Sequence, residues 1–198
     1  MTFWPGRTER IFIMYQKKES LGKKIQIICA NGFSGSSTEG VNLSDIITVN
    51  MPDDCEIQKV DSGTRFNAEF YEIVSCLPQS TRLLLAGKSM GAFKILKEVE
   101  EATHLLLSFH AVSILTVDPH CPLQADKKLP INALKYSPLL YMSNLRQTEH
   151  YPTGARVSGA DNYTFKDSLI DHFNIVRQPE VIHSFMRCLG YLRLKKAQ

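Results

Sequence analysis

The sequence predicts an α/β fold in three layers, with helices on both faces of a mostly parallel central sheet. Apolar runs of strand length recur along the chain and are separated by stretches with helical spacing. Several runs, such as 25–30 and 83–86, are almost continuously apolar, which is typical of strands covered on both faces. The 198 residues suit one hydrophobic core, so we expect 1–198 to form a single domain.

The expected elements follow this pattern along the chain. Strands are expected at the apolar runs 10–15, 24–30, 45–50, 82–86, 112–117 and 139–143. Helices are expected where apolar residues recur every three or four positions: over 66–77, in a segment that opens at Ser89 or Met90, and over 179–194. The segment 121–138 is rich in Pro, Lys and Asp, which predicts a loop or a short, minimal cap over one end of the sheet.

Charge and composition argue against several classes of function. The formal net charge is +3, from 23 basic and 20 acidic residues, and the basic residues gather only weakly, so no nucleic-acid partner is expected. No apolar run approaches the roughly 18–20 residues of a membrane span, and the first residues lack an apolar signal core. We therefore expect a cytoplasmic protein without stable membrane insertion, with export by another route left open. The oligomeric state is not predicted.

The cysteines and histidines do not predict a metal site or a disulfide framework. The five cysteines are an odd number and contain no Cys-x-x-Cys pair. The six histidines are dispersed, whereas a helical metal pair requires a spacing of three or four. We expect no metal and no cofactor.

The segment 83–92, Leu-Leu-Leu-Ala-Gly-Lys-Ser-Met-Gly-Ala, indicates a buried strand, a Gly-x-Ser-x-Gly turn and the start of a helix. A serine hydroxyl that attacks a carbonyl carbon must project from a sharp turn, and side chains two residues away on either side would collide with neighbouring backbone. Gly87 and Gly91 remove those side chains. Ser89 is therefore the predicted nucleophile, and the Met90 amide is one expected donor to an oxyanion.

A phosphate-binding loop is the alternative for these residues, because Gly-Lys-Ser over 87–89 matches the end of a Walker motif. That motif requires a glycine five residues before Gly87, where the sequence has Arg82. Residues 83–86 would also have to form an open cradle, although they are strongly strand-like. The nucleophile interpretation is therefore preferred.

A second glycine-bearing loop, Asn-Gly-Phe-Ser-Gly over 31–35, follows the run at 25–30. Together with the serine turn, it makes the chain resemble the α/β-hydrolase superfamily, in which this loop usually reads His-Gly followed by an apolar residue. Asn31 takes the place of that histidine. The second oxyanion donor is a main-chain group, which the departure leaves in place, and Phe33 is the candidate for it.

The resemblance covers most of the chain from residue 24 onward, and only the serine turn is specific. The segment 140–176 is similar to bacterial lipase-like hydrolases, in which a strand, a glycine-rich loop and a histidine follow one another. The resemblance implies hydrolysis of an ester, thioester or amide through an acyl-enzyme, without a cofactor.

The superfamily places an acid and then a histidine after the serine along the chain. His172 precedes the last helix, as the family's histidine does, and is the expected base. His183 falls inside the helix 179–194, where a surface or packing role fits better. His150 comes before the last expected turn region.

The acid that orients this base is left open among three residues. Asp118 ends the run 112–117, next to the nucleophile strand, on the rim where open α/β sheets place their sites. Asp161 and Glu149 lie in the polar segment that follows the next apolar run. A turn or cap role is the plainer interpretation of each aspartate.

The expected function is that of a serine hydrolase that cleaves an ester or thioester of a small to medium acyl group, with a small-molecule acyl substrate as its partner. An acyltransferase would use the same residues. A catalytically silent binding or scaffold protein that keeps the fold is the alternative from another class. A separation of more than about 5 Å between Ser89 and His172 would favour the silent protein.

Overall fold

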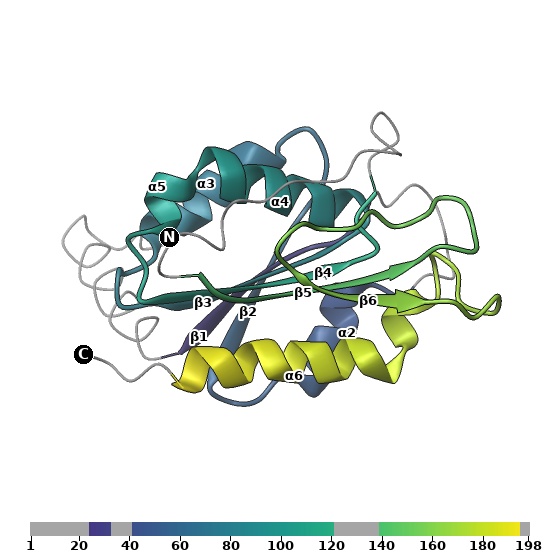
Figure 1. Ribbon diagram of the computed structural model, residues 1–198. Helices are drawn as coiled ribbons and strands as arrows, with labels where there is room; N and C mark the ends of the chain where they lie inside the picture. The colour runs from purple at the N-terminus through teal and green to yellow at the C-terminus, as the bar shows by residue number, and fades with distance from the viewer. Residues whose placement is uncertain (1–23, 33–40, 121–138, 195–198) are drawn as a thin grey trace, which may run out of the picture.

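The computed structural model describes residues 24–32, 41–120 and 139–194, and the six strands in these residues belong to one sheet (Figure 1). The strand order is β2-β1-β3-β4-β5-β6, and every neighbouring pair is parallel. The strands are β1 (Ile25–Ala30), β2 (Cys55–Val60), β3 (Arg82–Lys88), β4 (Ala111–Val117), β5 (Leu139–Gln147) and β6 (Asp161–Phe165). The parallel sheet that the sequence predicts is confirmed.

Helices cover both faces of this sheet (Figure 1). On one face lie α3 (Phe66–Cys76) and α4 (Met90–Glu101), which the short α5 (Thr103–Leu106) follows. On the other face lie α2 (Leu43–Asn50) and α6 (Pro179–Leu194). The expected three-layer α/β/α arrangement is therefore confirmed.

Alternate residues of the central strands supply two separate cores. On β3, Leu84 and Ala86 pack in the core beneath α2 and α6, whereas Leu83 and Leu85 pack beneath α3 and α4. All residues of β1 are buried and divide in the same way. Because both faces of these strands are withdrawn from water, their sequences are almost continuously apolar.

Most of the expected elements are found. The structure confirms the strands expected at 24–30, 82–86, 112–117 and 139–143, and the last of these continues to Gln147. It also confirms the helices expected over 66–77, from Ser89 or Met90, and over 179–194. The expected strand at 10–15 and the expected loop or cap at 121–138 lie outside the described residues.

The strand expected at 45–50 is wrong, because this segment belongs to the helix α2. Its β-branched residues favour a strand by intrinsic propensity. Leu43, Ser44 and Ile47 are buried, which is a helical spacing, and Val49 is 84% exposed. A strand would have buried alternate residues instead, so the packing of one helical face on the sheet outweighs the local propensity.

Asn31, the residue that departs from the α/β-hydrolase pattern, connects this helix to the end of β1 through two hydrogen bonds. Its Oδ1 accepts the backbone N–H of Ser44 at 3.1 Å, and its Nδ2 donates to Ser44 Oγ at 3.0 Å. The N–H groups of a first helical turn have no partner within the helix. Asn31 therefore satisfies one of them and joins β1 to α2.

Two strands, β2 and β6, are missing from the sequence-based expectations. They are the two edges of the described sheet. On β2 only Cys55 and Val60 are buried, and on β6 only Phe165 is. Edge strands meet solvent and need fewer apolar residues, so neither of them has the apolar run that marks the central strands.

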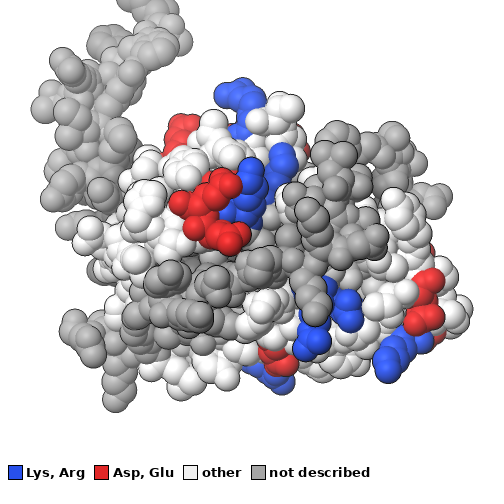
Figure 2. Space-filling view, turned by 45° about the horizontal axis from the view of Figure 1, so that its top comes forward, with Lys and Arg blue, Asp and Glu red and all other residues white. Residues whose placement is uncertain are grey.

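The described surface carries charges of both signs. Figure 2 shows Lys and Arg side chains interspersed with Asp and Glu on one face of the molecule. Two of the exposed ion pairs are Lys59–Asp45, with 3.0 Å between Nζ and Oδ1, and Arg187–Asp161, with 3.1 Å between Nη1 and Oδ2. Within the ranges that the structure describes, no helix combines the length and the apolar character needed to cross a bilayer.

The substitution Phe70→Ala tests the core beneath α3. The Phe70 side chain is fully buried and stacks on Phe66 with 5.8 Å between ring centroids. Its loss should lower the free energy of unfolding by about 3–5 kcal/mol, measured by urea unfolding. Val49→Ala, on the exposed side of α2, is the control and should change that free energy by less than about 0.5 kcal/mol. A Phe70→Ala loss no larger than the control's would contradict this placement.

Candidate active site

Ser89 occupies a tight turn between β3 and α4, at the carboxyl end of the sheet. Its backbone has φ 53° and ψ −124°, a left-handed conformation that few non-glycine residues adopt. The Ser89 N–H donates to the Val117 carbonyl at 3.0 Å, and the Ser89 carbonyl accepts the N–H groups of Phe93 at 3.1 Å and His120 at 3.2 Å. The surrounding backbone therefore holds the strained turn in place.

The two glycines of the turn allow a close approach of backbone. A Cβ on Gly87 would lie 2.6 Å from the Ala92 Cα, and a Cβ on Gly91 would overlap the carbonyl oxygens of Ala30 and Asn31. Side chains at either position would push α4 away from β1 and β3. The strand, sharp turn and helix expected from the sequence are all present here.

A chain of hydrogen bonds connects Ser89, His172 and Asp118. The distance from Ser89 Oγ to His172 Nε2 is 2.8 Å, and that from His172 Nδ1 to Asp118 Oδ2 is 2.5 Å. All three residues are buried: Ser89 is 9% exposed, His172 is 7% exposed and Asp118 is inaccessible. With a proton on Nδ1 donated to the carboxylate, Nε2 is free to accept the proton of the serine hydroxyl.

Asp118 follows β4 and is held on several sides. Its backbone is also left-handed, with φ 49°, and its N–H donates to the Leu145 carbonyl at 2.6 Å. Oδ1 accepts the backbone N–H of Gln147 at 3.0 Å, and Oδ2 lies 3.3 Å from Gln147 Nε2. A Cβ on Gly154 would overlap the carboxylate, so the loop after β5 also covers it closely. The carboxylate is thereby oriented towards His172.

The other acids proposed from the sequence lie elsewhere. Asp161 begins β6, where its exposed carboxylate accepts hydrogen bonds from Arg187 Nη1 at 3.1 Å and from the Tyr141 hydroxyl at 3.0 Å. Glu149 Oε1 accepts a hydrogen bond from Thr148 Oγ1 at 3.4 Å in an exposed setting. Among these three acids, Asp118 is the one that the described structure places against His172.

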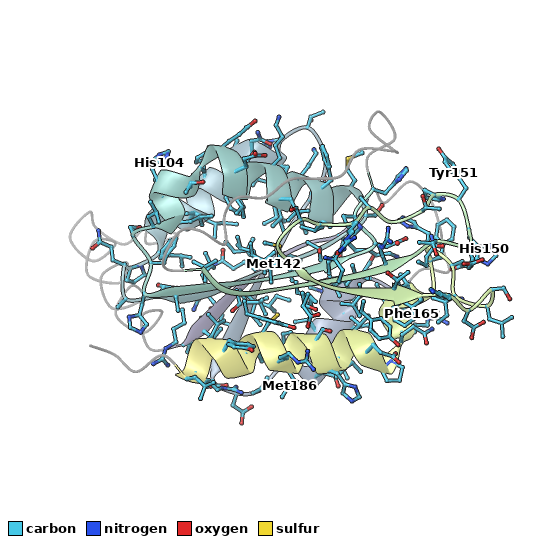
Figure 3. All side chains as sticks on the ribbon, in the orientation of Figure 1. His104, Met142, His150, Tyr151, Phe165 and Met186 are labelled. Carbon is cyan, nitrogen blue, oxygen red and sulfur yellow. The ribbon has the colours of Figure 1, made fainter. Side chains whose placement is uncertain are left out.

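The other two histidines are also separate from Ser89. His183 lies on α6, and His150 lies in the loop after β5, where its Nε2 is 2.5 Å from the Ser168 carbonyl oxygen. Figure 3 shows His150 and Tyr151 at the end of the molecule where β5 and β6 finish. His172 is therefore the histidine that the structure brings to the serine.

The two expected oxyanion donors differ in how far the structure describes them. Met90 is the first residue of α4, so its N–H belongs to a turn whose amides have no partner within the helix. Phe33 lies outside the described residues. A Cβ on Gly32, the residue before it, would lie 2.9 Å from Ser89 Cβ, so the chain just after β1 passes directly beside the serine side chain.

Lys88 and Gln147 adjoin this site and were not singled out by the sequence. Lys88 Nζ lies 3.5 Å from the Phe173 carbonyl oxygen. Burial lowers the pKa of the Lys88 ammonium group, and the carboxylates of Asp118 and Asp171 oppose that shift. Gln147 is fully buried against Asp118. Gln147 is the last residue of a strand, and Lys88 occupies the variable position of the turn motif. No sequence pattern therefore marked either residue.

His120 is a second buried histidine beside the first. Its side chain is 7% exposed, and its ring centroid lies 6.1 Å from that of His172. Nδ1 has no hydrogen-bond partner. Burial lowers the pKa of the His120 imidazole, and the neighbouring His172 lowers it further. His120 is therefore held in its neutral form more strongly than a free histidine.

No metal-binding cluster stands out at this site. In the described ranges, no group of three His, Cys, Asp or Glu side chains could hold a metal ion. Burial raises the pKa of the Cys29 thiol to about 12, which keeps it protonated at neutral pH. The site places the Ser89 hydroxyl against an imidazole that can take its proton.

The chain has distant structural similarity to known proteins. No protein-family model and no curated protein matches the sequence. The similar solved structures include an alanine mutant of YbtT, a type II thioesterase from the yersiniabactin NRPS/PKS biosynthetic pathway, and YbtT itself. The mutant has 14% identity and a TM-score of 0.49, with 100% of this chain and 99% of that chain covered. YbtT itself has 14% identity and a TM-score of 0.46, with 98% of each chain covered.

The lowered pKa of His120 predicts how stability changes with pH. Below the usual histidine pKa of about 6.5, the unfolded chain binds a proton that folded His120 resists, so the free energy of unfolding falls as the pH falls. His120→Gln removes this contribution. Urea unfolding at about pH 7.5 and pH 5.5 should therefore show a smaller acid loss for the variant than for the wild type. The same loss in both proteins would contradict the assignment.

Proposed function

We propose that this protein is a serine hydrolase that cleaves an ester or thioester of a small to medium acyl group through an acyl-enzyme. Ser89 is the nucleophile, His172 the general base and Asp118 the acid that orients it. The observation that carries the proposal is the continuous hydrogen bonding, with 2.8 Å from Ser89 Oγ to His172 Nε2 and 2.5 Å from His172 Nδ1 to Asp118 Oδ2.

Acylation begins when Ser89 Oγ attacks the acyl carbon while its proton passes to His172 Nε2. The imidazolium that forms lies against the Asp118 carboxylate, which stabilises its charge. When the tetrahedral intermediate collapses, the bond from the acyl carbon to the leaving oxygen or sulfur breaks, and the leaving atom keeps the electron pair. His172 Nε2 returns its proton to that atom, so an alcohol or thiol departs.

Deacylation repeats these steps with water. His172 takes a proton from a water molecule as that water attacks the acyl carbon of the Ser89 ester, and it then protonates Ser89 Oγ as the carboxylic acid leaves. The backbone amides of Met90 and Phe33 are the proposed donors to the oxyanion in both halves. These steps use side chains and amides of this chain together with water.

The 2.8 Å contact between Ser89 and His172 supports a hydrolase over the silent protein, for which a separation of more than about 5 Å was the expectation. The strained backbone at Ser89 supports it as well, because such strain is usually found at functional sites. An acyltransferase would use the same chain of residues with another acceptor in place of water.

A fluorophosphonate probe tests the nucleophile. The probe should phosphonylate the wild-type protein at Ser89, which mass spectrometry of the peptides identifies, because the Ser89 hydroxyl is paired with the His172 imidazole. Ser89→Ala should remain unlabelled and should lose hydrolysis of p-nitrophenyl esters and acyl-thioesters by at least roughly 10³-fold.

Ser75→Ala is the matched control, because Ser75 is an exposed serine on α3 whose hydroxyl donates to the Glu72 carbonyl. This variant should be labelled and should hydrolyse both substrate types like the wild type. A folded wild-type protein that stays unlabelled, or equal hydrolysis by wild type and Ser89→Ala, would remove Ser89 from the mechanism.

A further inference from the structure

Four aromatic rings form a continuous row beside the serine. The ring centroids of Tyr151 and His120 are 6.0 Å apart, those of His120 and His172 are 6.1 Å apart, and those of His172 and Phe173 are 5.8 Å apart. Each contact is edge-on, with interplanar angles of 82°, 71° and 83°, an arrangement that aromatic pairs favour. His172 is therefore flanked by rings on two sides.

The ends of this row are exposed although its middle is buried. Tyr151 is 81% exposed and Phe173 is 57% exposed, whereas His120 and His172 are each 7% exposed. Figure 3 shows Tyr151 at the edge of the molecule where the last strands end. Packing inside the protein does not explain the two outer rings, because most of their surface meets solvent. They are available to a molecule that approaches His172.

The segment that carries Phe173 is fixed by the turn that presents His172. Asp171 Oδ1 accepts the N–H groups of Phe173 at 2.8 Å and Asn174 at 2.7 Å. Lys88 Nζ lies 3.5 Å from the Phe173 carbonyl oxygen. The backbone of Phe173 therefore keeps a defined place relative to His172, and the exposed ring lies against the imidazole.

The segment that carries Tyr151 is connected to Asp118 through hydrogen bonds of Gln147. Gln147 Nε2 donates to the carbonyls on both sides of Tyr151, at 2.9 Å for His150 and 2.7 Å for Pro152. The same Gln147 binds both carboxylate oxygens of Asp118. Gln147 thus links the backbone beside Tyr151 to Asp118, and the turn capped by Asp171 carries both His172 and Phe173.

The chemistry of the leaving group indicates which part of a substrate contacts the row of four rings. His172 Nε2 must pass its proton to the leaving oxygen or sulfur, so that atom lies against the imidazole when the bond breaks. The remainder of the alcohol or thiol extends from that atom, past the neighbours of the imidazole. The acyl part, in contrast, extends from the carbon that becomes bonded to Ser89 Oγ.

Tyr151 and Phe173 carry no formal charge at neutral pH, and burial lowers the pKa of the His120 imidazole that contacts Tyr151, which favours its neutral form. Tyrosine and phenylalanine rings offer flat apolar faces, to which planar and apolar groups bind. An anionic group would meet the negative faces of the Tyr151 and Phe173 rings, and a flat apolar group matches those faces best. The two rings therefore suit an alcohol or thiol whose remainder, its arm, is uncharged.

We infer that Phe173 and Tyr151 determine the specificity for the leaving group, and that the substrate is an ester or thioester whose alcohol or thiol carries an uncharged arm with a planar or apolar surface. This inference rests on the proposed function, because it requires His172 to protonate the leaving atom. It goes beyond that function in naming the part of the substrate that the site selects and the side chains that select it.

Matched benzyl and methyl esters of butyric acid test this inference, because they share an acyl group and differ in the arm of the leaving group. Phe173→Ala and Tyr151→Ala should each lower kcat/KM for the benzyl ester by roughly tenfold and that for the methyl ester by less than about twofold. The rate constant for hydrolysis of the butyryl-enzyme should not change, since the leaving group has departed by then. Tyr151→Phe keeps the ring and should keep the preference.

Leu169→Ala and Tyr163→Ala are the controls, because these side chains are 79% and 47% exposed and neither has a ring contact with His172 or His120 among those found in the described residues. Both should retain the benzyl preference of the wild type. Thermal unfolding of each of these variants should match that of the wild type, since all the substituted side chains are exposed.

Equal losses on the benzyl and methyl esters would overturn the inference, and so would losses that follow acyl length when methyl butyrate is compared with methyl octanoate. Unchanged kcat/KM for both esters in Phe173→Ala and Tyr151→Ala would also overturn it. These outcomes leave the proposed function standing as long as hydrolysis depends on Ser89. If the folded wild type hydrolyses no ester or thioester and Ser89 stays unlabelled, the proposed function fails, and the inference fails with it.

Discussion

The parallel register between β3 and β4 is the constraint on which the site depends. Lys88 pairs with Val117 in that register, so the next residues of the two strands, Ser89 and Asp118, leave the sheet at the same level. The hydrogen bond from the Ser89 N–H to the Val117 carbonyl continues the pairing to the serine. A side chain of the size of imidazole can then bridge hydroxyl and carboxylate, and His172 enters from the segment before α6 to do so.

Both ends of this bridge are strained. Ser89 and Asp118 are the two non-glycine residues with positive φ among those described, and each such conformation costs on the order of 1–3 kcal/mol. The strain persists because the neighbouring strands are buried on both faces and fix the backbone, while Gln147 binds the Asp118 carboxylate. The rigid sheet thus places a buried carboxylate, an imidazole and a hydroxyl in one line. Gln147, which binds the carboxylate, also binds the backbone beside Tyr151 of the aromatic row.

The sequence predicted the buried parts of the fold and the local part of the site. Mostly apolar runs mark β1, β3 and β4, and two glycines around a serine mark the turn, because burial and close backbone approach restrict those residues strongly. The edge strands β2 and β6 have no such restriction, and α2 was taken for a strand because its packing depends on the distant sheet. The choice of Asp118 over Asp161 stayed open, since contacts between residues far apart in the chain decide it. Contacts between residues far apart in the chain also place Gln147, Lys88 and His120 beside the site.

Asp118→Asn measures the central claim most directly, with Asp161→Asn as its control. Asparagine fills the same space but offers an N–H to the imidazole, which favours the tautomer whose Nε2 carries the proton and cannot accept that of Ser89. The kcat for hydrolysis of p-nitrophenyl butyrate should therefore fall by roughly 10⁴-fold in Asp118→Asn. Asp161→Asn loses an exposed pair with Arg187 and should stay within about twofold of the wild type. Equal kcat values for wild type and a folded Asp118→Asn variant would contradict the account.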